Sequence, residues 1–330
     1  MKESRIKAIW PHNFPPKIKN SASFVHSLAK ALKDLGVDIK LEYIGNLRNI
    51  KNFVLAKKYL SCKIKNFDII HSQFGSACGY LVSKLPGVKI LSLRGSDWYG
   101  TSSGSLWDLF HGKLQRELTK RSLNRYSGII VMSQRMIGEV SPYYNKNLIK
   151  IPDGLDLNVF YQIDRHKARK FLGKKEDNTP YVLFASNLKK NPVKRSELAI
   201  QAYVEAKKMI PNLKLDFVYN ECHKKMNIII NSSNVLLLTS THEGWPNIIK
   251  EGLACNIPFI TTDVSDLKQI SEKERSCFVT DADPKLLGRA IVNAISQDRP
   301  YDLRKYAKCF EIETIAKNIL KFYETCLNKE

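Results

Sequence analysis

The stretch from Val235 to Val264 constrains the fold more than any other part of the sequence. It begins with the continuous apolar run 235–238, and a run of this length between polar residues predicts a strand that is buried on both faces. Pro246 suits the first turn of a helix, and Asn256 with Pro258 predicts the end of that helix about ten residues later. The stretch therefore predicts a strand, a loop and a helix of an open parallel sheet.

The loop and the helix start of this stretch can surround an anionic ligand. Ligands collect at the carboxyl ends of parallel strands, and the free amides of Asn247 and Ile248 can face an anion. Glu251 projects from the same helix face, whereas Glu243 lies in the loop on the other side. Two carboxylates beside an amide pocket suit a ligand with both phosphate and hydroxyl groups. The simpler interpretation is that Glu243 complements the helix dipole and that Glu251 is a solvated helix residue.

Three segments of the same stretch resemble glycosyltransferase family 4. They are Glu243 to Asn247, Lys250 to Pro258 and Thr261 to Val264. The resemblance implies the GT-B architecture, in which two Rossmann-like, doubly wound parallel-sheet domains face a central cleft and a C-terminal helix crosses back to the first domain. It also implies sugar transfer from a nucleotide donor with retention. By this resemblance Glu243 contacts the donor sugar and Glu251 the ribose hydroxyls. The other donor-binding candidates of the segment are Pro246, Asn247 and Ile248.

A second segment with the same resemblance marks the domain boundary. Residues 149–160 are similar to the family's passage into its second domain, with Asp153 in place of asparagine. A chain of 330 residues also suggests about two domains. We therefore expect residues 1–152, together with a C-terminal helix in 312–330, to form an acceptor-side domain. Residues 153–311 are expected to form the nucleotide-sugar-binding domain.

The segment from Leu91 to Trp98 resembles the family's His-Gly-x-Asp segment, which faces the donor sugar, but Arg94 stands where histidine is usual. The resemblance makes Arg94 and Asp97 candidate catalytic residues. The planar guanidinium group of Arg94 can form two hydrogen bonds to either the donor phosphate or an anionic acceptor. The alternative is a buried salt bridge between Arg94 and Asp97. His71, at the end of another predicted strand, is more often a structural than a catalytic histidine in such a position.

Two positions after the strand predicted at 181–187 correspond to the family's phosphate contacts. Family members commonly have Gly-Arg after this strand, and Asn187 lies at that position here. Lys194 matches the lysine at the start of the next helix, where a positive charge adds to amide donors aimed at phosphate. A plain surface lysine is the alternative. Near the amino terminus, residues 19–22 stand where many members have a glycine pair.

Charge is concentrated in the first half of the chain. Residues 1–152 contain 25 lysines and arginines against 9 acidic residues, a net charge of +16, whereas the remainder carries +5. Two basic clusters, at 51–65 and 113–125, lie on predicted helices. They favour contact with an anionic membrane or a lipid-linked anionic glycan, and solvated helix faces are the alternative. Because aromatic residues are not interleaved with the basic runs as base stacking requires, no nucleic-acid partner is expected.

Several classes of protein are disfavoured by what the sequence lacks. It contains no intact GxGxxG, P-loop or HExxH motif, and Asp281 with Asp283 predicts a turn and helix cap rather than a metal site. Its seven cysteines form no CxxC pair, which is typical of reduced thiols in a cytosolic protein. No signal-type segment and no run of about eighteen apolar residues occurs. A cytoplasmic protein at the inner face of the membrane is therefore expected.

The sequence as a whole predicts a retaining, metal-independent glycosyltransferase. It would move a hexose-type sugar from a nucleotide-diphosphate donor to a glycan or lipid-linked acceptor, in cell-surface polysaccharide or glycolipid synthesis. Lys194 and the amides near Asn247 would stabilise the departing diphosphate, while Glu243 and Glu251 would fix the sugar and the ribose. The alternative is a GT-B-like binding protein for anionic polymers whose donor site is vestigial.

Overall fold

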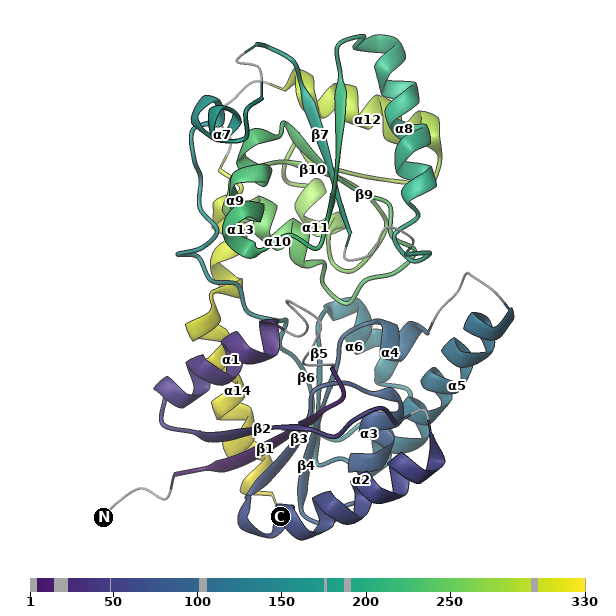
Figure 1. Ribbon diagram of the computed structural model, residues 1–330, viewed down its shortest axis with the longest axis vertical. Helices are drawn as coiled ribbons and strands as arrows, with labels where there is room; N and C mark the ends of the chain where they lie inside the picture. Colours follow the sequence, from purple (N-terminus) through teal and green to yellow (C-terminus); the bar gives the residue numbers. More distant parts are fainter. Residues whose placement is uncertain are drawn as a thin grey trace. The chain divides into compact units, whose positions relative to one another are not determined.

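The structure is a computed structural model of the chain. It describes residues 5–14, 23–47, 49–100, 106–174, 177–186, 191–297 and 302–329. The contacts between residues divide the chain into two compact units, one of residues 1–154 with 312–330 and the other of residues 155–311. Each unit consists of a parallel sheet covered by helices on both faces (Figure 1). The predicted class of two parallel-sheet α/β domains is therefore confirmed.

The N-terminal unit contains a six-stranded parallel sheet in the order β2-β1-β3-β4-β5-β6. Its strands are β1 (Lys7–His12), β2 (Asp38–Tyr43), β3 (Ile69–Ser72), β4 (Val88–Leu93), β5 (Gly128–Val131) and β6 (Leu148–Lys150). Its helices are α1 (Ser23–Asp34), α2 (Ile50–Lys63), α3 (Ser76–Val82), α4 (Ser96–Tyr99), α5 (Leu106–Ser122), α6 (Gln134–Val140) and α14 (Ile312–Leu327). The central strands β3 and β5 are buried along their whole length, as expected of a sheet covered on both faces.

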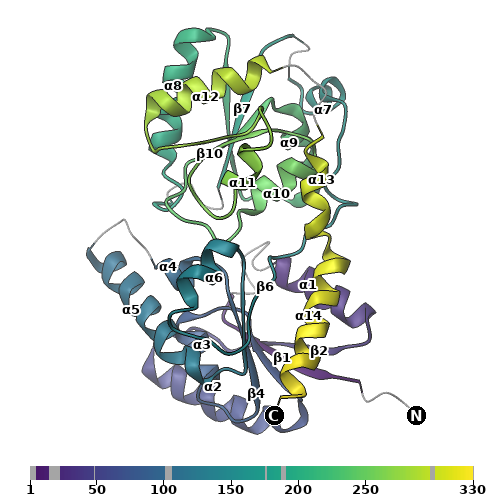
Figure 2. The same ribbon diagram turned by 180° about the vertical axis from the view of Figure 1, so that it is seen from behind.

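Two layers of helices cover this sheet. On one face α1 packs against α14, and on the other α3 lies between α2 and α5 (Figures 1 and 2). The C-terminal helix α14 thus returns to the first unit, as the resemblance implied. The indole nitrogen of Trp10 donates to the Tyr323 hydroxyl at 2.8 Å, and this hydroxyl lies 2.7 Å from Nδ1 of the fully buried His71. His71 therefore has a structural role, and its burial lowers its pKa well below the usual value.

The C-terminal unit contains a five-stranded parallel sheet in the order β11-β10-β9-β7-β8. Its strands are β7 (Tyr181–Ser186), β8 (Lys214–Tyr219), β9 (Val235–Leu238), β10 (Phe259–Thr262) and β11 (Phe278–Thr280). Its helices are α7 (Arg165–Phe171), α8 (Ser196–Met209), α9 (His223–Ser232), α10 (Asn247–Ala254), α11 (Lys268–Ser271), α12 (Pro284–Ser296) and α13 (Arg304–Ala307). The strand and helix predicted from the stretch 235–264 are β9 and α10.

The core of this unit explains why β9 is a continuous apolar run. Leu236 and Leu238 belong to one buried cluster, with α10, whereas Val235 and Leu237 belong to a second cluster, with α8 and α12. Successive side chains of β9 therefore enter opposite layers. Gly252 lets α10 approach β9 closely, because a Cβ atom at this position would lie 2.1 Å from the Leu236 side chain.

Candidate functional site

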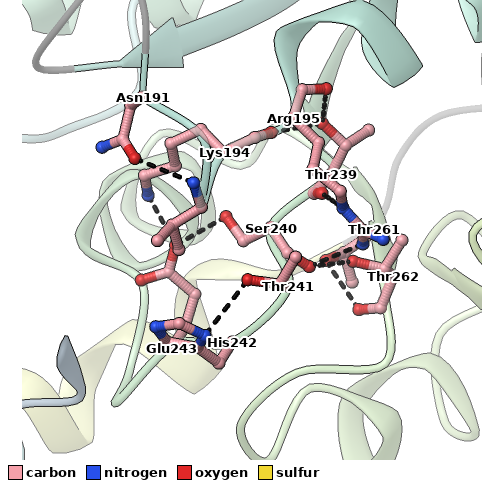
Figure 3. Close-up of polar contacts among 11 residues, drawn as sticks. Asn191, Lys194, Arg195, Thr239, Ser240, Thr241, His242, Glu243, Thr261 and Thr262 are labelled. Atoms are coloured by element: carbon pink, nitrogen blue, oxygen red, sulfur yellow. Dashed lines mark hydrogen bonds and ion pairs between the residues drawn. The ribbon is translucent and has the colours of Figure 1, made fainter. Parts of the chain in front are cut away.

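The candidate site of the C-terminal unit lies where the strand order of its sheet reverses. Strand β7 pairs with β8 on one side and with β9 on the other. In open parallel α/β sheets, ligands bind beyond the carboxyl ends of the strands at such a point. Two segments meet there: residues 191–195, between β7 and α8, and residues 239–243, directly after β9 (Figure 3).

Lys194 and Glu243 form an ion pair between these two segments. The Lys194 Nζ atom lies 2.5 Å from Oε1 of Glu243, and the Ser240 hydroxyl donates to the same oxygen at 2.7 Å (Figure 3). The side chains of Lys194 and Glu243 are only 19% and 16% exposed. The lysine predicted to contact the diphosphate and the glutamate predicted to contact the sugar therefore share one partly buried site.

Arg195 fixes the position of Lys194. Its backbone is left-handed, with φ 48° and ψ 57°, a conformation that costs free energy in a residue with a Cβ atom. Its side chain donates to the carbonyl oxygens of Thr239, at 2.6 Å, and Ser240, at 2.9 Å. The Thr239 hydroxyl in turn donates to the Lys194 carbonyl oxygen at 2.6 Å. No sequence signal singled out Arg195, because its partners are distant in sequence.

The loop after β9 is also held from the other side, by the last residue of β10 and by a residue shortly after it. The hydroxyl of Thr262 donates to the Ser240 carbonyl oxygen at 2.6 Å, and that of Ser265 donates to the Gly244 carbonyl oxygen at 2.7 Å. Hydrogen bonds from two neighbouring strand ends thus fix the backbone around Glu243. A site held in this way does not need to reorganise when charge develops on a bound group.

Free backbone amides lie at the start of α10. Pro246, with φ −69° and ψ 120°, is the residue before the helix, so the helix begins one residue later than predicted. Asn247 is exposed and Ile248 half-buried, and within the described part of the chain their amides have no acceptor, as is normal in a first helical turn. They remain able to bind an anion beside Glu243.

Glu251 lies one turn further along α10 and is partly buried. Its burial raises the pKa of its carboxyl group from 4.5 to about 7, although the charges of Lys250 and Lys194 act in the opposite direction. The side chain of Glu251 is thus partly buried, unlike the fully solvated helix residue of the simpler interpretation. Near neutral pH the carboxyl group can either donate or accept a hydrogen bond.

The raised pKa of Glu251 predicts a pH-dependent stability. Between pH 4.5 and about 7 the folded chain keeps a proton that the unfolded chain releases, so the free energy of unfolding falls as pH rises through this window. Glu251→Gln removes this term. We expect the variant to be more stable than the wild type by roughly 2–3 kcal/mol at pH 8, and the difference to vanish near pH 4.5. Urea unfolding between these pH values measures this difference, and Glu197→Gln, at an exposed position of α8, is the control. If the free energies of unfolding of wild type and Glu251→Gln changed with pH in parallel, the prediction would be wrong.

Arg94 in the N-terminal unit has partners that its sequence neighbourhood did not indicate. Its Nη2 atom lies 3.0 Å from Oδ1 of Asp153, and its Nε atom donates to both oxygens of the same carboxylate. It also donates to the side-chain oxygen of Gln73 at 3.0 Å. The alternative of an ion pair between the side chains of Arg94 and Asp97 is thus not what the structure shows. Asp153, which replaces the family's asparagine, is the partner of Arg94.

Asp97 has a different environment from the one expected of a residue facing a ligand. It is completely buried, and its carboxylate accepts backbone amide hydrogens from Gly75 at 2.8 Å and from Arg94 and Gly95 at 2.9 Å each. Burial raises its pKa, and these hydrogen bonds act in the opposite direction. Asp97 therefore positions the loops after β3 and β4 and is not itself open to a substrate. Its predicted catalytic role finds no support in this geometry.

A cavity that the sequence did not indicate lies beyond β1 and β3, where the strand order of the N-terminal sheet reverses. It has a volume of about 420 Å³. Its lining consists of Asn13, Tyr43, Asn46, Leu47, Phe74, Ser76, Ala77, His111, Leu114, Gln115 and Leu118. The lining contains no lysine, arginine or carboxylate. Ser76 has a φ of 56° and a buried hydroxyl group that has no hydrogen-bond partner in the described structure.

Two predicted features lie outside the described residues, namely Asn187 and the loop 19–22. No group of three or more histidine, cysteine, aspartate or glutamate residues in the described ranges could hold a metal ion. Asp283 caps α12 by accepting from the amides of Lys285 and Leu286 at 2.9 Å, which confirms the predicted cap. All seven cysteines are free thiols. Within the described ranges no helix is long and apolar enough to span a membrane.

Comparison with known proteins finds one matching family model and a curated relative. Residues 211–297, which contain Glu243 and α10, match the family model described as Glycosyl transferases group 1. N-acetyl-alpha-D-glucosaminyl L-malate synthase from Bacillus anthracis is 24% identical over 238 residues, which are 62% of this chain and 59% of that protein. The chain thus spans about three fifths of the length of this curated relative.

Solved structures with the same fold cover nearly the whole chain. Sucrose-phosphate synthase from Thermosynechococcus elongatus has a TM-score of 0.80 at 16% identity, over 99% of this chain and 100% of that one. A glycosyltransferase from Rickettsia africae has a TM-score of 0.71 at 14% identity, over 99% and 100% of the two chains. Anabaena Alr3699/HepE in complex with UDP-glucose also has a TM-score of 0.71, at 14% identity over 97% and 100%. The two units therefore have the GT-B fold, and together with the matched domain these findings support a glycosyltransferase.

Proposed function

We propose that the chain is a retaining, metal-independent glycosyltransferase that moves a hexose-type sugar from a nucleotide-diphosphate donor to a glycan or lipid-linked acceptor. The observation that carries this proposal is the Lys194–Glu243 pair beside the free amides of Asn247 and Ile248, at the reversal point of the C-terminal sheet. This site combines a fixed cation and amide donors for phosphate with a carboxylate for hydroxyl groups.

The proposed mechanism is based on positioning and electrostatic stabilisation. The departing diphosphate becomes more negative as the bond to the sugar breaks, and Lys194 with the amides of α10 stabilises that charge. In the ligand-free site Glu243 neutralises Lys194, so a bound diphosphate shares the ammonium group with this carboxylate. Glu243 keeps its position and accepts from hydroxyl groups of the sugar with its second carboxylate oxygen, and Glu251 accepts from the ribose. No residue of the site is assigned as a covalent nucleophile.

The names of similar proteins suggest which donor to test first. Anabaena Alr3699/HepE was solved with UDP-glucose, and the pneumococcal O-GlcNAc transferase GtfA was solved with UDP and GlcNAc. We infer that UDP-hexoses are the first donors to test with this chain. The identity between these proteins and this chain is 13–15%, so the choice is a starting point for a screen of nucleotide sugars.

The cavity of the N-terminal unit supports an acceptor with a neutral sugar at its reactive end. Its polar groups are side-chain amides, hydroxyls and the imidazole of His111, and Tyr43 and Phe74 add aromatic surface. Such a lining hydrogen-bonds to sugar hydroxyls and stacks on sugar rings, and it contains no lysine or arginine for an anionic group. We therefore infer that the +16 charge of residues 1–152 serves an anionic membrane surface that carries the acceptor. A cytoplasmic location and a role in cell-surface polysaccharide or glycolipid synthesis follow from this proposal.

Replacing Lys194 tests the donor site directly. Lys194→Ala is expected to weaken UDP binding by about tenfold to a hundredfold, because a hydrogen bond to a charged group contributes roughly 1.5–3 kcal/mol. Binding of uridine, which lacks the diphosphate, is expected to change little. Isothermal titration calorimetry with both ligands measures the difference.

Lys208→Ala is the matched control, because Lys208 on α8 also pairs with a glutamate, Glu205, but its own side chain is 63% exposed. Equal losses of UDP and uridine affinity in Lys194→Ala would show that Lys194 is not a phosphate contact. If the wild type bound and hydrolysed no nucleotide sugar of the screen, the alternative of a GT-B-like binding protein for anionic polymers, with a vestigial donor site, would replace this proposal.

A further inference from the structure

The first turns of α5 have an apolar surface that nothing in the described N-terminal unit covers. Leu106, Trp107 and Phe110 are 87%, 67% and 58% exposed. We propose that these three side chains insert into the interfacial region of a bilayer that contains anionic lipids. This inference rests on the fold of the N-terminal unit and goes beyond the proposed transfer reaction, because it assigns an inserting surface and not only a charged one.

The apolar residues form one stripe on α5. Leu106, Phe110 and Leu114 follow one another at intervals of four residues, so they share a helix face, and the rings of Trp107 and Phe110 stack at 5.9 Å. The opposite face, which contains Gly112 and Thr119, is buried against α3 and α4. The apolar stripe is therefore not part of the core. Single exposed apolar residues are common in soluble domains, but a contiguous group with two large aromatic rings marks an interaction site.

The position of α5 makes this stripe accessible. In Figures 1 and 2 the start of α5 projects from the N-terminal unit, away from the sheet. The helix that begins there continues to the buried Ser122, so its second half is anchored in the unit. A helix fixed at one end and exposed at the other can present Trp107 to a flat surface without unfolding. Tryptophan is well suited to the boundary between headgroups and acyl chains.

Lysine and arginine residues follow the apolar turns of α5 directly in sequence. Lys113 and Arg116 are exposed and form no ion pair within the described ranges. Further along the helix, Arg121 is paired with Glu117 at 2.7 Å, and Lys120 lies 4.0 Å from the centre of the Tyr143 ring. The cations nearest to the apolar turns are thus the ones available to an outside partner. Apolar residues followed by available cations are the pattern of a helix that lies in an anionic membrane surface.

The neighbouring helix α2 also has an exposed apolar residue and exposed lysines. Helix α2 lies in the same layer as α5, with α3 between them. Ile50, at its start, is 83% exposed, and Lys51, Lys57 and Lys58 are exposed as well. Lys63 differs from these lysines, because its Nζ atom lies 2.9 Å from Glu42 and over the Tyr59 ring. Lys51, Lys57, Lys58 and the exposed Lys65 are thus the lysines of the cluster at 51–65 that can contact lipid, whereas Lys63 is held by Glu42.

Charge also decides between a membrane and a second copy of the chain as the partner of this surface. Residues 1–152 carry a net charge of +16, so two copies that met through this unit would repel each other. An anionic bilayer attracts the same charge and accepts the apolar side chains. Electrostatic attraction brings the unit to the surface, and insertion of Leu106, Trp107 and Phe110 then slows its release.

Trp107 is a natural probe for insertion. Trp10 and Trp98 are buried, at 0% and 5% exposure, and Trp245 is half-buried, so Trp107 is the tryptophan most open to solvent. We expect its fluorescence to shift to shorter wavelength on vesicles of phosphatidylcholine with phosphatidylglycerol, and lipids brominated on the acyl chain to quench it. Neither change is expected with phosphatidylcholine alone. The spectrum of Trp107→Phe, subtracted from that of the wild type, isolates this signal.

Sedimentation with the same vesicles measures the contribution of the apolar turns. The triple variant Leu106→Ser, Trp107→Ser, Phe110→Ser is expected to bind the anionic vesicles at least about tenfold more weakly. Burial of a single large apolar side chain already contributes enough free energy for about a tenfold change in affinity. The matched control is Phe171→Ser in α7, whose side chain is 73% exposed but lies in the C-terminal unit. The control is expected to sediment like the wild type, and unfolding curves should be unchanged in both variants because the side chains are exposed.

Three outcomes would overturn the proposal. Binding without a Trp107 shift, fully reversed at about 1 M salt where the Debye length is about 3 Å, would show an electrostatic contact without insertion. A dimer that forms without lipid and is lost in the triple variant would show that a second copy covers the stripe. Equal binding of wild type and triple variant, with or without a fluorescence shift, would exclude α5 as the inserting element.

Discussion

Glu243→Gln is expected to lower kcat with a nucleotide-sugar donor by on the order of tenfold to a thousandfold, with a much smaller change in KM. The Glu243 carboxylate is fixed by Lys194 at 2.5 Å and by Ser240 at 2.7 Å, so its position is set before a donor binds. Glutamine keeps the shape of the side chain but removes the charge that the sugar and Lys194 experience. The loss should therefore appear in turnover, and steady-state kinetics of transfer or donor hydrolysis measures it.

A double-mutant cycle separates this role from simple support of the loop. If Glu243 and Lys194 act as one unit, Lys194→Ala combined with Glu243→Gln should cost much less than the product of the two single effects. Glu205→Gln, in the pair with Lys208 on α8, is the control and should keep wild-type kcat. Unchanged turnover in Glu243→Gln would remove this residue from the proposed site.

The sequence was sufficient to predict the fold because the signals that define it are local. The apolar run of β9 enters two layers of core at once, so its pattern could only suit a strand buried on both faces. Helix α14, Ile312–Leu327, lies within the range 312–330 in which a C-terminal helix was expected. The cap at Asp283 was also predicted, because a carboxylate before Pro284 satisfies amides that lie within three residues of it.

The partners of polar side chains were less predictable, because they depend on tertiary contacts. The short spacing of Arg94 and Asp97 suggested that they pair with each other, but the guanidinium group of Arg94 binds Asp153, which is 59 residues away. Likewise, the left-handed backbone of Arg195 is held by carbonyl oxygens of Thr239 and Ser240, 44 and 45 residues further along the chain. No local pattern carries that information.

The exposed face of α5 was missed for a different reason. The predicted helix was identified by the basic cluster at 113–125, whereas the structure begins this helix at Leu106, so the turn with Trp107 and Phe110 lay outside the prediction. Apolar residues at helical spacing are also the usual sign of a core face. Only the packing of the buried residues Gly112 and Thr119 shows that the apolar stripe points outward.

Asp97→Ala is expected to lower the free energy of unfolding of the N-terminal unit by about 3–5 kcal/mol. The Asp97 side chain is completely buried and accepts hydrogen bonds from the amides of Gly75, Arg94 and Gly95. Alanine would leave these amides buried without an acceptor, and each such group costs about 1–3 kcal/mol. Urea unfolding followed by the fluorescence of the buried Trp10 and Trp98 reports on this unit.

The size of this loss distinguishes a positioning role from a catalytic one. Asp97→Asn can keep the Oδ1 oxygen, which accepts from Arg94 and Gly95, but it turns its amide group toward the N–H of Gly75, so it should lose part of the stability that Asp97→Ala loses. Asp38→Ala, at an exposed position in β2, should change stability little. A carboxylate that served mainly to contact a donor sugar would behave in the opposite way, with stability near the wild type and kcat strongly reduced. That result for Asp97→Asn would contradict a positioning role for Asp97, because a group that holds two loops together cannot be removed without weakening them.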